Sequence, residues 1–598
     1  MEWTVVLIFV SAAFIFIFVR GVYEDKKRTR RFVEDLKNNY GSYPAREYEV
    51  QEYENLTHFF RLNAPSYKEG QIIDDTTWND LDMDNVFMSM NHTLSQTGEE
   101  YFYDMLRKPV SDEDTIKERD RVIDFFMEHE EERLNYQKVF ASMGRTKKLS
   151  MADYLNYMDE LESEENYKHY FCVLLGIAAI ILIFAKPPLG FVTLISAMIF
   201  NIATYFKRKG DIDPYITTFA YLIRAMRGSE KLMENRPEEL AEYNERLKND
   251  LYELRGLGRN TYILMSGQRM TGSLLELPLD YLRIFFHLDL IKFNSMLAIV
   301  RNKKSYIDDM FNIVGFLDSC ISIGAYRKSL GNWCVPEHTL TGAHEQIVFH
   351  IKALYHPLLK EPVPSDIDTE RGILITGSNA SGKSTFLKAA ALAALFSETI
   401  ATVPAEEYRA PFFDIYSSMA LRDDILSGES YYMVEIKTLK RIIDAVSDSV
   451  RPVLCFVDEV LRGTNTVERI TASSEILKSL AAPGVLTIAA THDIELTYIL
   501  ENHYNNFHFN LYKIATIIKN GTVKNNAQMP HAAAILQYNA HLIAKQYGHC
   551  FSSIEPPNKS SKSIFFISIL GVGIHRTSRQ RPKLAYLRCH HFYVSPLR

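Results

Sequence analysis

The sequence is poor in cysteine and tryptophan, with six and three among 598 residues. The cysteines stand far apart, at positions 172, 320, 334, 455, 550 and 589. This scatter excludes a disulfide framework and a cysteine-based zinc site, and it fits a reducing compartment. Acidic side chains outnumber basic ones, with a formal net charge of −7. No overall electrostatic attraction to nucleic acid is therefore expected. The hydrophobic share of 47% is ample for about two to four domains.

The charge is divided unevenly along the chain. Residues 510–598 carry 12 Lys or Arg and one acidic residue, Glu555, which leaves 55 basic and 73 acidic side chains in residues 1–509, a net charge of −18. Two hypotheses account for this atypical tail. It is either a divergent or frame-shifted segment, or a basic arm that binds nucleic acid.

Two regions are apolar enough to predict contact with a membrane. Residues Thr4 to Val19 are uncharged, and basic residues follow directly from Arg20. A cleaved signal peptide normally has its positive charges before the apolar run, so an uncleaved anchor with its basic flank in the cytoplasm is favoured.

The second apolar region is Tyr170 to Phe206, which contains one charged residue, Lys186. Two apolar runs on either side of Pro187-Pro188 predict a transmembrane hairpin, although each run is short. Lys207-Arg208-Lys209 then place the chain back on the cytoplasmic side, giving three spans in all. A buried hairpin in a soluble helical domain is the alternative.

The motif that organises the second half is R-G-I-L-I-T-G-S-N-A-S-G-K-S-T, residues 371–385. A short apolar strand leads into Gly377-x4-Gly382-Lys383-Ser384, the phosphate-loop pattern, and an Ala- and Leu-rich helix follows. The two glycines let backbone N–H groups converge on a phosphate at a helix N-terminus. Lys383 is predicted to neutralise the β- and γ-phosphates, and the Ser384 hydroxyl to ligate Mg²⁺.

Two later strands end in residues that complete a nucleotide hydrolase. The apolar run 453–457 is followed by Asp458, a predicted Mg²⁺ ligand, and by Glu459, which is placed to orient or deprotonate the attacking water. The strand 487–491 ends at His492, a candidate sensor of the γ-phosphate. The predicted catalytic residues are therefore Lys383, Glu459 and His492.

Several strings together resemble the MutS family of DNA mismatch repair ATPases. T-G-S-N-A-S-G-K-S-T (376–385) is similar to its phosphate loop, and D-D-I-L-S-G-E-S-Y-Y-M-V-E (423–435) to its signature segment. D-E-V-L-R-G-T-N-T (458–466) and T-H-D (491–493) resemble its next two motifs, and Met83 to Pro109 resembles the start of its core domain. The combination is far more specific than any single motif.

The resemblance implies a dimeric ATPase with composite ATP sites. It implies that the whole loop binds the nucleotide in cis, through Gly377, Ser378, Asn379, Ala380, Ser381, Gly382, Lys383, Ser384 and Thr385. Ser430 would approach the γ-phosphate bound by the opposite subunit. The expected fold is an α/β ABC-type P-loop ATPase domain in the C-terminal half, preceded by an all-α lever and core domain with transmembrane helices. The family's mismatch-reading N-terminal domain is expected to be missing.

These observations predict seven segments. They are an N-terminal anchor (1–31), a juxtamembrane linker (32–80), the first part of a helical core (81–169), a transmembrane hairpin (170–209), a lever-like helical region (210–330), the ATPase domain (331–509) and the basic tail (510–598).

Three functions remain open from the sequence. The first is a membrane-anchored MutS-like ATPase that binds DNA as a homodimer, with ATP and Mg²⁺ as its cofactors. The second is a nucleotide-gated membrane scaffold that binds a protein partner in place of DNA. The third is a transporter ATPase, which three short spans and a long helical region disfavour.

Overall fold

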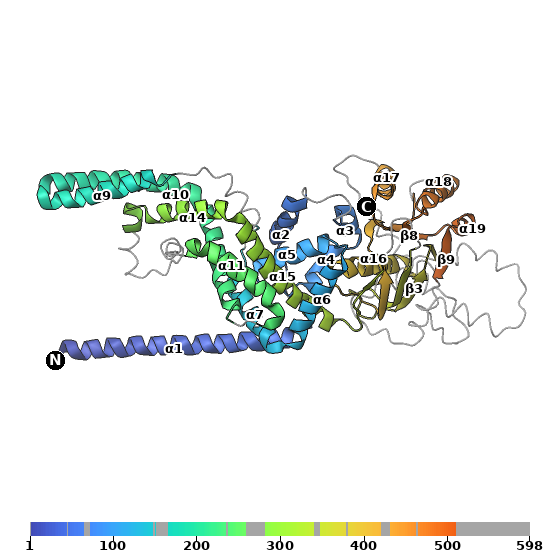
Figure 1. Ribbon diagram of the computed structural model, residues 1–598, viewed down its shortest axis with the longest axis horizontal. Coiled ribbons are helices and arrows are strands. Elements are labelled where there is room, and N and C mark those ends of the chain that lie inside the picture. The colour runs from blue at the N-terminus through green and yellow to red at the C-terminus, as the bar shows by residue number, and fades with distance from the viewer. Residues whose placement is uncertain are drawn as a thin grey trace, which may run out of the picture.

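The computed structural model describes most of the chain up to residue 509. The described residues are 2–44, 46–64, 72–146, 150, 165–234, 237–258, 282–339, 347–377, 381–419, 431–461 and 465–509. They form a helical part, α1 to α15, and an α/β part, β1 to β9 with α16 to α19. The two parts lie end to end, and the predicted tail 510–598 lies outside the described residues (Figure 1).

The helical part is built around α15 (Lys304–Ser329), whose residues from Met310 onward are mostly buried. Its Asp318 carboxylate accepts hydrogen bonds from Ser95 Oγ at 2.6 Å and Ser95 N at 2.8 Å. Ser95 also caps the N-terminus of α5 (Gln96–Arg107), because its Oγ accepts a hydrogen bond from Gly98 N at 3.0 Å. The other helices are α1 (Glu2–Asn39), α2 (Val50–Asn63), α3 (Asp75–Asp80), α4 (Met83–Met90), α5 (Gln96–Arg107), α6 (Glu113–Glu128), α7 (Glu130–Met143), α9 (Tyr167–Ala185), α10 (Pro187–Leu232), α11 (Ala241–Gly258) and α14 (Leu288–Asn302).

The prediction of a linker over residues 32–80 is wrong. Most of this stretch belongs to the helical part, as the end of α1 followed by α2 and α3. Tyr40, Phe60 and Trp78 are buried there, and the Trp78 ring packs at a tilt against Tyr103 of α5 with ring centroids 4.9 Å apart. These aromatic residues have no regular spacing in the sequence, so a pattern could not predict their burial. They belong to the core because they pack against partners far along the chain.

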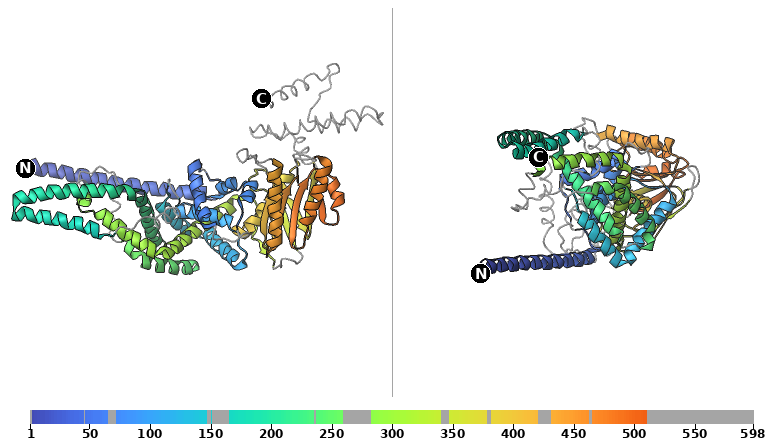
Figure 2. Two further views of the ribbon diagram at one scale, coloured as in Figure 1. Left: turned by 90° about the horizontal axis from the view of Figure 1, so that it is seen from above. Right: turned by 60° about the vertical axis from the view of Figure 1, so that its left-hand side comes forward.

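The predicted hairpin is formed by α9 and the first half of α10. These are the two described helices long and apolar enough to cross a membrane, over Tyr167–Ala185 and Pro187–Gly210. Many of their apolar side chains are exposed, and α10 continues past the hairpin to Leu232. The hairpin and α1 project from the same end of the helical part in the same direction (Figures 1 and 2). The side chains of most of the predicted N-terminal anchor lie outside the described residues.

The described residues of the predicted lever region (210–330) lie mainly in helices, and one face of α11 packs inward. Apolar residues at helical spacing are buried in a stripe along this face, at Leu240 just before α11 and at Tyr243, Leu247, Leu251 and Leu254 within it. The stripe belongs to the same core as α15, so the helical part is a single packed unit.

The α/β part holds two sheets. The larger sheet is parallel, with strand order β6-β7-β8-β4-β9. Its strands are β4 (Gly372–Gly377), β6 (Asp414–Ser418), β7 (Val453–Asp458), β8 (Val485–Thr491) and β9 (Tyr504–Phe509). The smaller sheet has the order β1-β5-β2-β3, formed by β1 (Glu337–His338), β2 (Phe349–Leu354), β3 (Ser365–Thr369) and β5 (Glu407–Ala410).

Helices cover both faces of the parallel sheet. Its central strands are therefore continuous apolar runs, in which apolar and polar residues do not alternate. β7 is buried at every residue, with Leu454 and Phe456 in the core shared with α16 (Lys383–Thr399). Cys455 and Val457 face the opposite core, formed with α17 (Tyr431–Asp448) and α18 (Thr466–Ser479). The short helix α19 (Glu495–Ile499) lies before β9.

A buried arginine joins the two parts. Arg327 of α15 is fully buried and pairs with Asp120 at 2.6 Å and Asp124 at 2.8 Å, both on α6. It also donates to Thr402 Oγ1 and Ala401 O, both at 2.8 Å, just after α16. The C-terminal end of α16 is therefore fixed to the helical part.

Candidate functional site

The predicted site residues lie at the carboxyl ends of three neighbouring strands, β7, β8 and β4. Thr376 of β4 pairs with Thr491 of β8, and Asp458 of β7 pairs with Ala490 of β8. The residues that follow these strands are consequently brought to one edge of the sheet, where open α/β sheets bind their ligands.

The loop after β4 has the backbone that its glycines predict. Gly377 has φ 153°, and a Cβ there would lie 2.5 Å from Phe509 O. Gly382 has φ 97° and precedes the first residue of α16, which is Lys383. Lys383 Nζ donates to Gly377 O at 2.9 Å, so its charge lies over the start of the loop.

The loop residues fit a bound polyphosphate. Ser381 Oγ is buried and has no hydrogen-bond partner among the described residues. Ser384 and Thr385 lie in the first turn of α16, where free N–H groups and the helix dipole favour an anion. Ser378, Asn379 and Ala380, which the sequence also predicts to bind phosphate, lie outside the described residues.

The predicted Mg²⁺ ligands face each other. Ser384 Oγ donates to Asp458 Oδ2 at 2.5 Å, so a hydroxyl and a carboxylate from two different elements converge. Among the described residues no group of three or more His, Cys, Asp or Glu side chains could hold a metal ion. One carboxylate and one hydroxyl suit Mg²⁺, which keeps several waters and takes its other ligands from substrate phosphates.

Glu459 and His492 form a pair beside these ligands. His492 Nε2 lies 2.5 Å from Glu459 Oε1, and His492 Nδ1 lies 3.0 Å from Gly377 O. His492 thus connects the start of the phosphate loop with the predicted catalytic carboxylate. Glu459 adopts the left-handed conformation, φ 59°, and its N–H donates to Ala490 O at 2.9 Å. Strained backbone of this kind is common at active sites.

Two further residues support the site and have no role predicted from the sequence. Glu435 of α17 is buried, and its carboxylate accepts a hydrogen bond from Leu461 N, two residues after Glu459. Arg469 of α18 binds both carboxylate oxygens of Asp493 at 2.8 and 2.6 Å, which fixes the chain just after His492. Glu435 ends the signature-like string 423–435, which is the signal that could have found it, whereas Arg469 lies outside every quoted motif.

One cysteine near the site is inert. Cys455 lies in β7, and its burial raises the pKa of the thiol to about 12. The thiol stays protonated at neutral pH, so Cys455 acts as a small core residue.

The sequence also predicts Ser430 as a residue that acts across a dimer interface. It lies outside the described residues, as does the whole segment 420–430.

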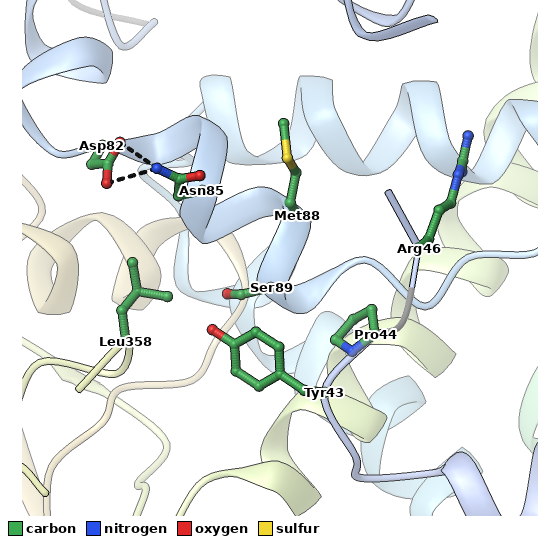
Figure 3. A pocket seen from close by; sticks show the side chains of 8 residues that line it. All are labelled: Tyr43, Pro44, Arg46, Asp82, Asn85, Met88, Ser89 and Leu358. Atoms are coloured by element: carbon green, nitrogen blue, oxygen red, sulfur yellow. Dashed lines mark hydrogen bonds between the residues drawn. The ribbon is translucent and has the colours of Figure 1, made fainter. Parts of the chain in front are cut away.

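A separate open cavity of about 370 Å³ lies between the two parts of the molecule. It is lined by Leu358 and by side chains of α4 and of the segment that precedes α2 (Figure 3). Asn85 in its wall donates to both carboxylate oxygens of Asp82, at 2.9 and 3.0 Å. None of the predicted nucleotide-binding residues lines this cavity.

Comparison with known proteins identifies the family. Residues 373–545 match the family model described as MutS domain V, and the match includes β4, α16, β7 and β8. This stretch of the chain is a MutS-type domain. Its α/β part therefore has the P-loop ATPase fold, as the motifs predict. The match runs beyond residue 509, where the resemblance of the sequence is expected to fade.

The similar proteins are mismatch repair proteins and a related homolog. The DNA mismatch repair protein MutS of Thermus aquaticus is 36% identical over 163 residues, 26% of this chain and 20% of that protein. MutS of Pseudothermotoga lettingae is 37% identical over 153 residues, 24% of this chain and 18% of that protein. MutS protein homolog 4 of Homo sapiens is 29% identical over 253 residues, 40% of this chain and 26% of that protein. The aligned region is thus only about a fifth to a quarter of these relatives.

Proposed function

We propose that the chain is a Mg²⁺-dependent ATPase that works as a dimer. The proposal is carried by one observation, the convergence of five predicted side chains at one edge of the parallel sheet. These are Lys383, Ser384, Asp458, Glu459 and His492.

Each side chain has a role that its contacts support. Lys383 and the N–H groups at the start of α16 bind the phosphates, while Ser384 and Asp458 hold the metal ion. Bound Mg²⁺ supplies charge neutralisation at the β- and γ-phosphates. Glu459 orients the attacking water and accepts its proton. His492 holds Glu459 in place from a position beside the phosphate loop.

Nucleotide binding and turnover test this proposal directly. Purified protein should bind ATP more tightly with Mg²⁺ than with EDTA and should hydrolyse it, and Lys383→Ala should abolish both. Lys388→Ala, five residues further along α16, is the matched control. Absence of ATP binding by the wild-type protein in Mg²⁺ would overturn the proposal.

The composite site is proposed from family membership. Each ATP would lie between the phosphate loop of one subunit and Ser430 of the other. A mixed dimer of Ser430→Ala and Lys383→Ala subunits then retains one intact site and should recover part of the activity. If the mixture is as inactive as each parent, Ser430 does not act across the interface.

DNA is the proposed partner of the helical part. Three relatives of this domain, from Thermus aquaticus, Pseudothermotoga lettingae and Exiguobacterium, are named as DNA mismatch repair proteins, although the chain covers only about a fifth of each. Residues 1–509 carry a net charge of −18, so binding would depend on a local basic groove. DNA affinity measured over a salt series tests this, because contacts to phosphates give a steep salt dependence.

A membrane tether is the second element of the proposal. The two hairpin helices are only about one-fifth buried over their most apolar windows. Exposed side chains such as Leu174, Ile181 and Ile199, each over 60% exposed, cover the hairpin. α9 has 19 residues, which gives a length of about 28 Å at 1.5 Å per residue, close to the thickness of the hydrocarbon core.

Several polar groups are paired at the base of the hairpin. Asn201 of α10 donates to Cys172 O at 3.1 Å and to Phe285 O at 2.9 Å. Tyr205 OH donates to Asp289 Oδ2 at 2.8 Å, one turn before Lys209, which lies 3.3 Å from the same oxygen. Polar groups that are paired at one end, with apolar side chains beyond them, suit a helix pair that enters a bilayer.

Membrane association can be tested by adding charge to the exposed face. Leu174→Lys, Ile181→Lys and Ile199→Lys together should move the protein from the membrane fraction to the soluble fraction. Charged residues inside a bilayer cost about 2.5–3.5 kcal/mol each on insertion scales. Tyr252→Lys, at an exposed position of α11, is the control. A wild-type protein that is soluble after cell lysis would refute the tether.

A nucleotide-gated scaffold that binds a protein partner is the alternative function. The acidic balance of residues 1–509 favours it over DNA binding. Absence of DNA binding at low salt, together with intact ATP turnover, would select this alternative.

A further inference from the structure

A cluster of exposed basic residues follows the apolar part of α1. Residues 20–31 carry six basic and two acidic side chains, a net charge of +4, whereas residues 1–509 as a whole carry −18. Every residue from Arg20 to Arg31 is exposed, so α1 presents this charge to its surroundings on all sides. A dense cluster of this kind attracts an anionic partner. The cluster, called the α1 cluster below, consists of Arg20, Lys26, Lys27, Arg28, Arg30 and Arg31.

The base of the hairpin carries a second group of basic residues, the hairpin cluster, at positions 207–209 of α10. Lys207 is exposed, and Arg208 and Lys209 are partly exposed. Lys209 Nζ lies 3.3 Å from the carboxylate of the buried Asp289, which neutralises part of the charge. The cluster directly follows Phe206, which is 60% exposed at the end of the apolar run. Basic side chains thus begin where the exposed apolar surface of the hairpin ends.

Both projecting elements are fixed on the same helix, α7. Lys37, in the last turn of α1, pairs with Glu130 of α7 at 2.6 Å, and Tyr40 just after α1 is buried. α10 is held at the other end of α7, where Arg224 Nε donates to Met143 O at 2.9 Å. The direction of α1 relative to the hairpin is therefore set by contacts within the protein.

The two clusters begin at the same depth. α1 and the hairpin run in the same direction and reach about equally far from the helical core (Figures 1 and 2). Arg20 stands 18 residues after Glu2, where α1 begins, and Lys207 stands 20 residues after Pro187, where α10 begins. At about 1.5 Å per residue these distances are about 27 and 30 Å, close to the thickness of the hydrocarbon core of a bilayer. Two segments far apart in the sequence thus place their first charges in one plane.

Exposed tyrosines lie in the same plane. Tyr23 of α1 follows Arg20 and is 65% exposed, and Tyr167 and Tyr170 at the base of α9 are 61% and 51% exposed. Tyrosine is enriched where a bilayer meets water, because its ring is apolar and its hydroxyl is polar. Nucleic acid could contact the basic side chains but would leave the apolar hairpin beyond them uncovered, whereas a bilayer covers both.

We propose that the α1 cluster, the hairpin cluster and these tyrosines form one surface that binds the headgroups of acidic phospholipids, in the leaflet that faces the helical core. The inference rests on the proposed membrane tether and deepens it by naming the lipid. Apolar burial alone would hold the hairpin in any bilayer, and the clusters add a preference for negatively charged lipid.

Distance and charge both support this preference. Lys26 lies about 9 Å beyond Arg20 along α1, about one Debye length at physiological ionic strength, and the long side chains of lysine and arginine reach back toward the headgroups. The acidic remainder of residues 1–509 would be repelled by an anionic leaflet. The clusters therefore reverse the sign of the charge at the place where the protein meets the lipid.

The lipid selectivity of the reconstituted full-length protein tests the proposal. The protein is placed in phosphatidylcholine bilayers that contain either spin-labelled phosphatidylglycerol or spin-labelled phosphatidylcholine, and electron paramagnetic resonance measures the share of each label immobilised by the protein. One basic side chain near an anionic surface strengthens binding about fivefold. Wild-type protein should therefore prefer phosphatidylglycerol by about fivefold or more, and the preference should fall in about 1 M salt, where the Debye length is about 3 Å.

Variants of the two clusters should lower this preference in steps. The α1 variant should lose most of the preference, and addition of Lys207→Gln should lower it further, because both clusters face the same leaflet. The thermal midpoint of the α1 variant in detergent should equal that of the wild type, since every changed side chain is exposed. The α1 variant combines Lys26→Gln, Lys27→Gln, Arg28→Gln, Arg30→Gln and Arg31→Gln.

A matched control removes five exposed positive charges from the α/β part and should keep the full preference. It combines Lys352→Gln, Arg409→Gln, Lys437→Gln, Lys440→Gln and Lys478→Gln.

The outcomes distinguish the inference from the tether. Wild-type protein that is soluble after cell lysis would overturn both. Membrane-bound wild-type protein without a preference for phosphatidylglycerol, or an α1 variant with an unchanged preference, would overturn the inference alone. An α1 variant that binds DNA more weakly but keeps its lipid preference would assign the cluster to nucleic acid, and the inference would be overturned as well.

Discussion

The exchange of Glu459 for Gln tests the catalytic assignment most sharply. The Glu459 carboxylate lies 2.5 Å from His492 Nε2, and its backbone is held by Ala490 O. Gln has nearly the same shape and can still accept a hydrogen bond from the imidazole, so the fold and the phosphate loop should be preserved. Only the ability to take a proton from water is lost.

The size of the effect follows from the role. A general base contributes about 10²- to 10⁴-fold to a rate, which corresponds to about 2.7–5.4 kcal/mol in the activation free energy. Glu459→Gln should therefore bind ATP with Mg²⁺ as the wild type does and should hydrolyse it at least about 100-fold more slowly. ATP binding by equilibrium titration and hydrolysis in single-turnover and steady-state assays measure the two quantities separately.

A matched control excludes a general effect of losing one negative charge. Glu475→Gln changes an exposed carboxylate on α18 that pairs only with Lys478 among the described residues, and it should hydrolyse ATP normally. Turnover by Glu459→Gln within a few-fold of the wild type would refute the role of Glu459. A joint loss of ATP binding and hydrolysis would show that the side chain shapes the nucleotide site rather than activating water.

Three other perturbations have defined outcomes. Ser384→Ala should remove the Mg²⁺ dependence of ATP binding, measured by titration with Mg²⁺ and with EDTA. Arg327→Met leaves two carboxylates without their buried partner and should lower the free energy of unfolding by about 3–5 kcal/mol, measured by denaturant titration with Arg121→Met as the exposed control. Burial and the neighbouring Asp309 raise the pKa of Asp250 to about 7 from an ordinary value near 3.8. As the pH rises, the unfolded chain therefore releases this proton before the folded protein does. The free energy of unfolding consequently falls as the pH rises from about 4 to 7. Asp250→Asn should remove that fall, seen as thermal midpoints that depend less on pH in this window.

The nucleotide site could be predicted because its signals are local. Gly377 and Gly382 require backbone conformations that other residues adopt rarely, and the strand before them and the helix after them are short and apolar. Asp458 and His492 follow such strands directly, and parallel strands bring their carboxyl ends together. The positions of these residues thus follow from local patterns and one topological rule.

The linker prediction failed because the stretch has no local pattern. Trp78 and Phe60 are buried by residues of α5, and the stretch itself has no periodic pattern that would predict their burial. The boundary of the hairpin is a similar case. α10 is continuous from Pro187 to Leu232 although Gly210 and Pro214, two residues unfavourable inside a helix, lie within it, so the sequence gives no sign of this continuity.

The contacts between the two parts suggest how nucleotide and helical core act on each other. α16 begins at the phosphate loop with Lys383 and ends where Arg327 fixes Thr402 to the helical part. The opposite edge of the sheet is held by Asp80 at Met419. These two joints are buried and polar, and both lie close to β6, because Phe413 N, just before β6, donates to Glu398 near the end of α16 at 2.7 Å. A displacement of the end of β6 relative to the helical part therefore has to involve α3, which packs into the same core as α15.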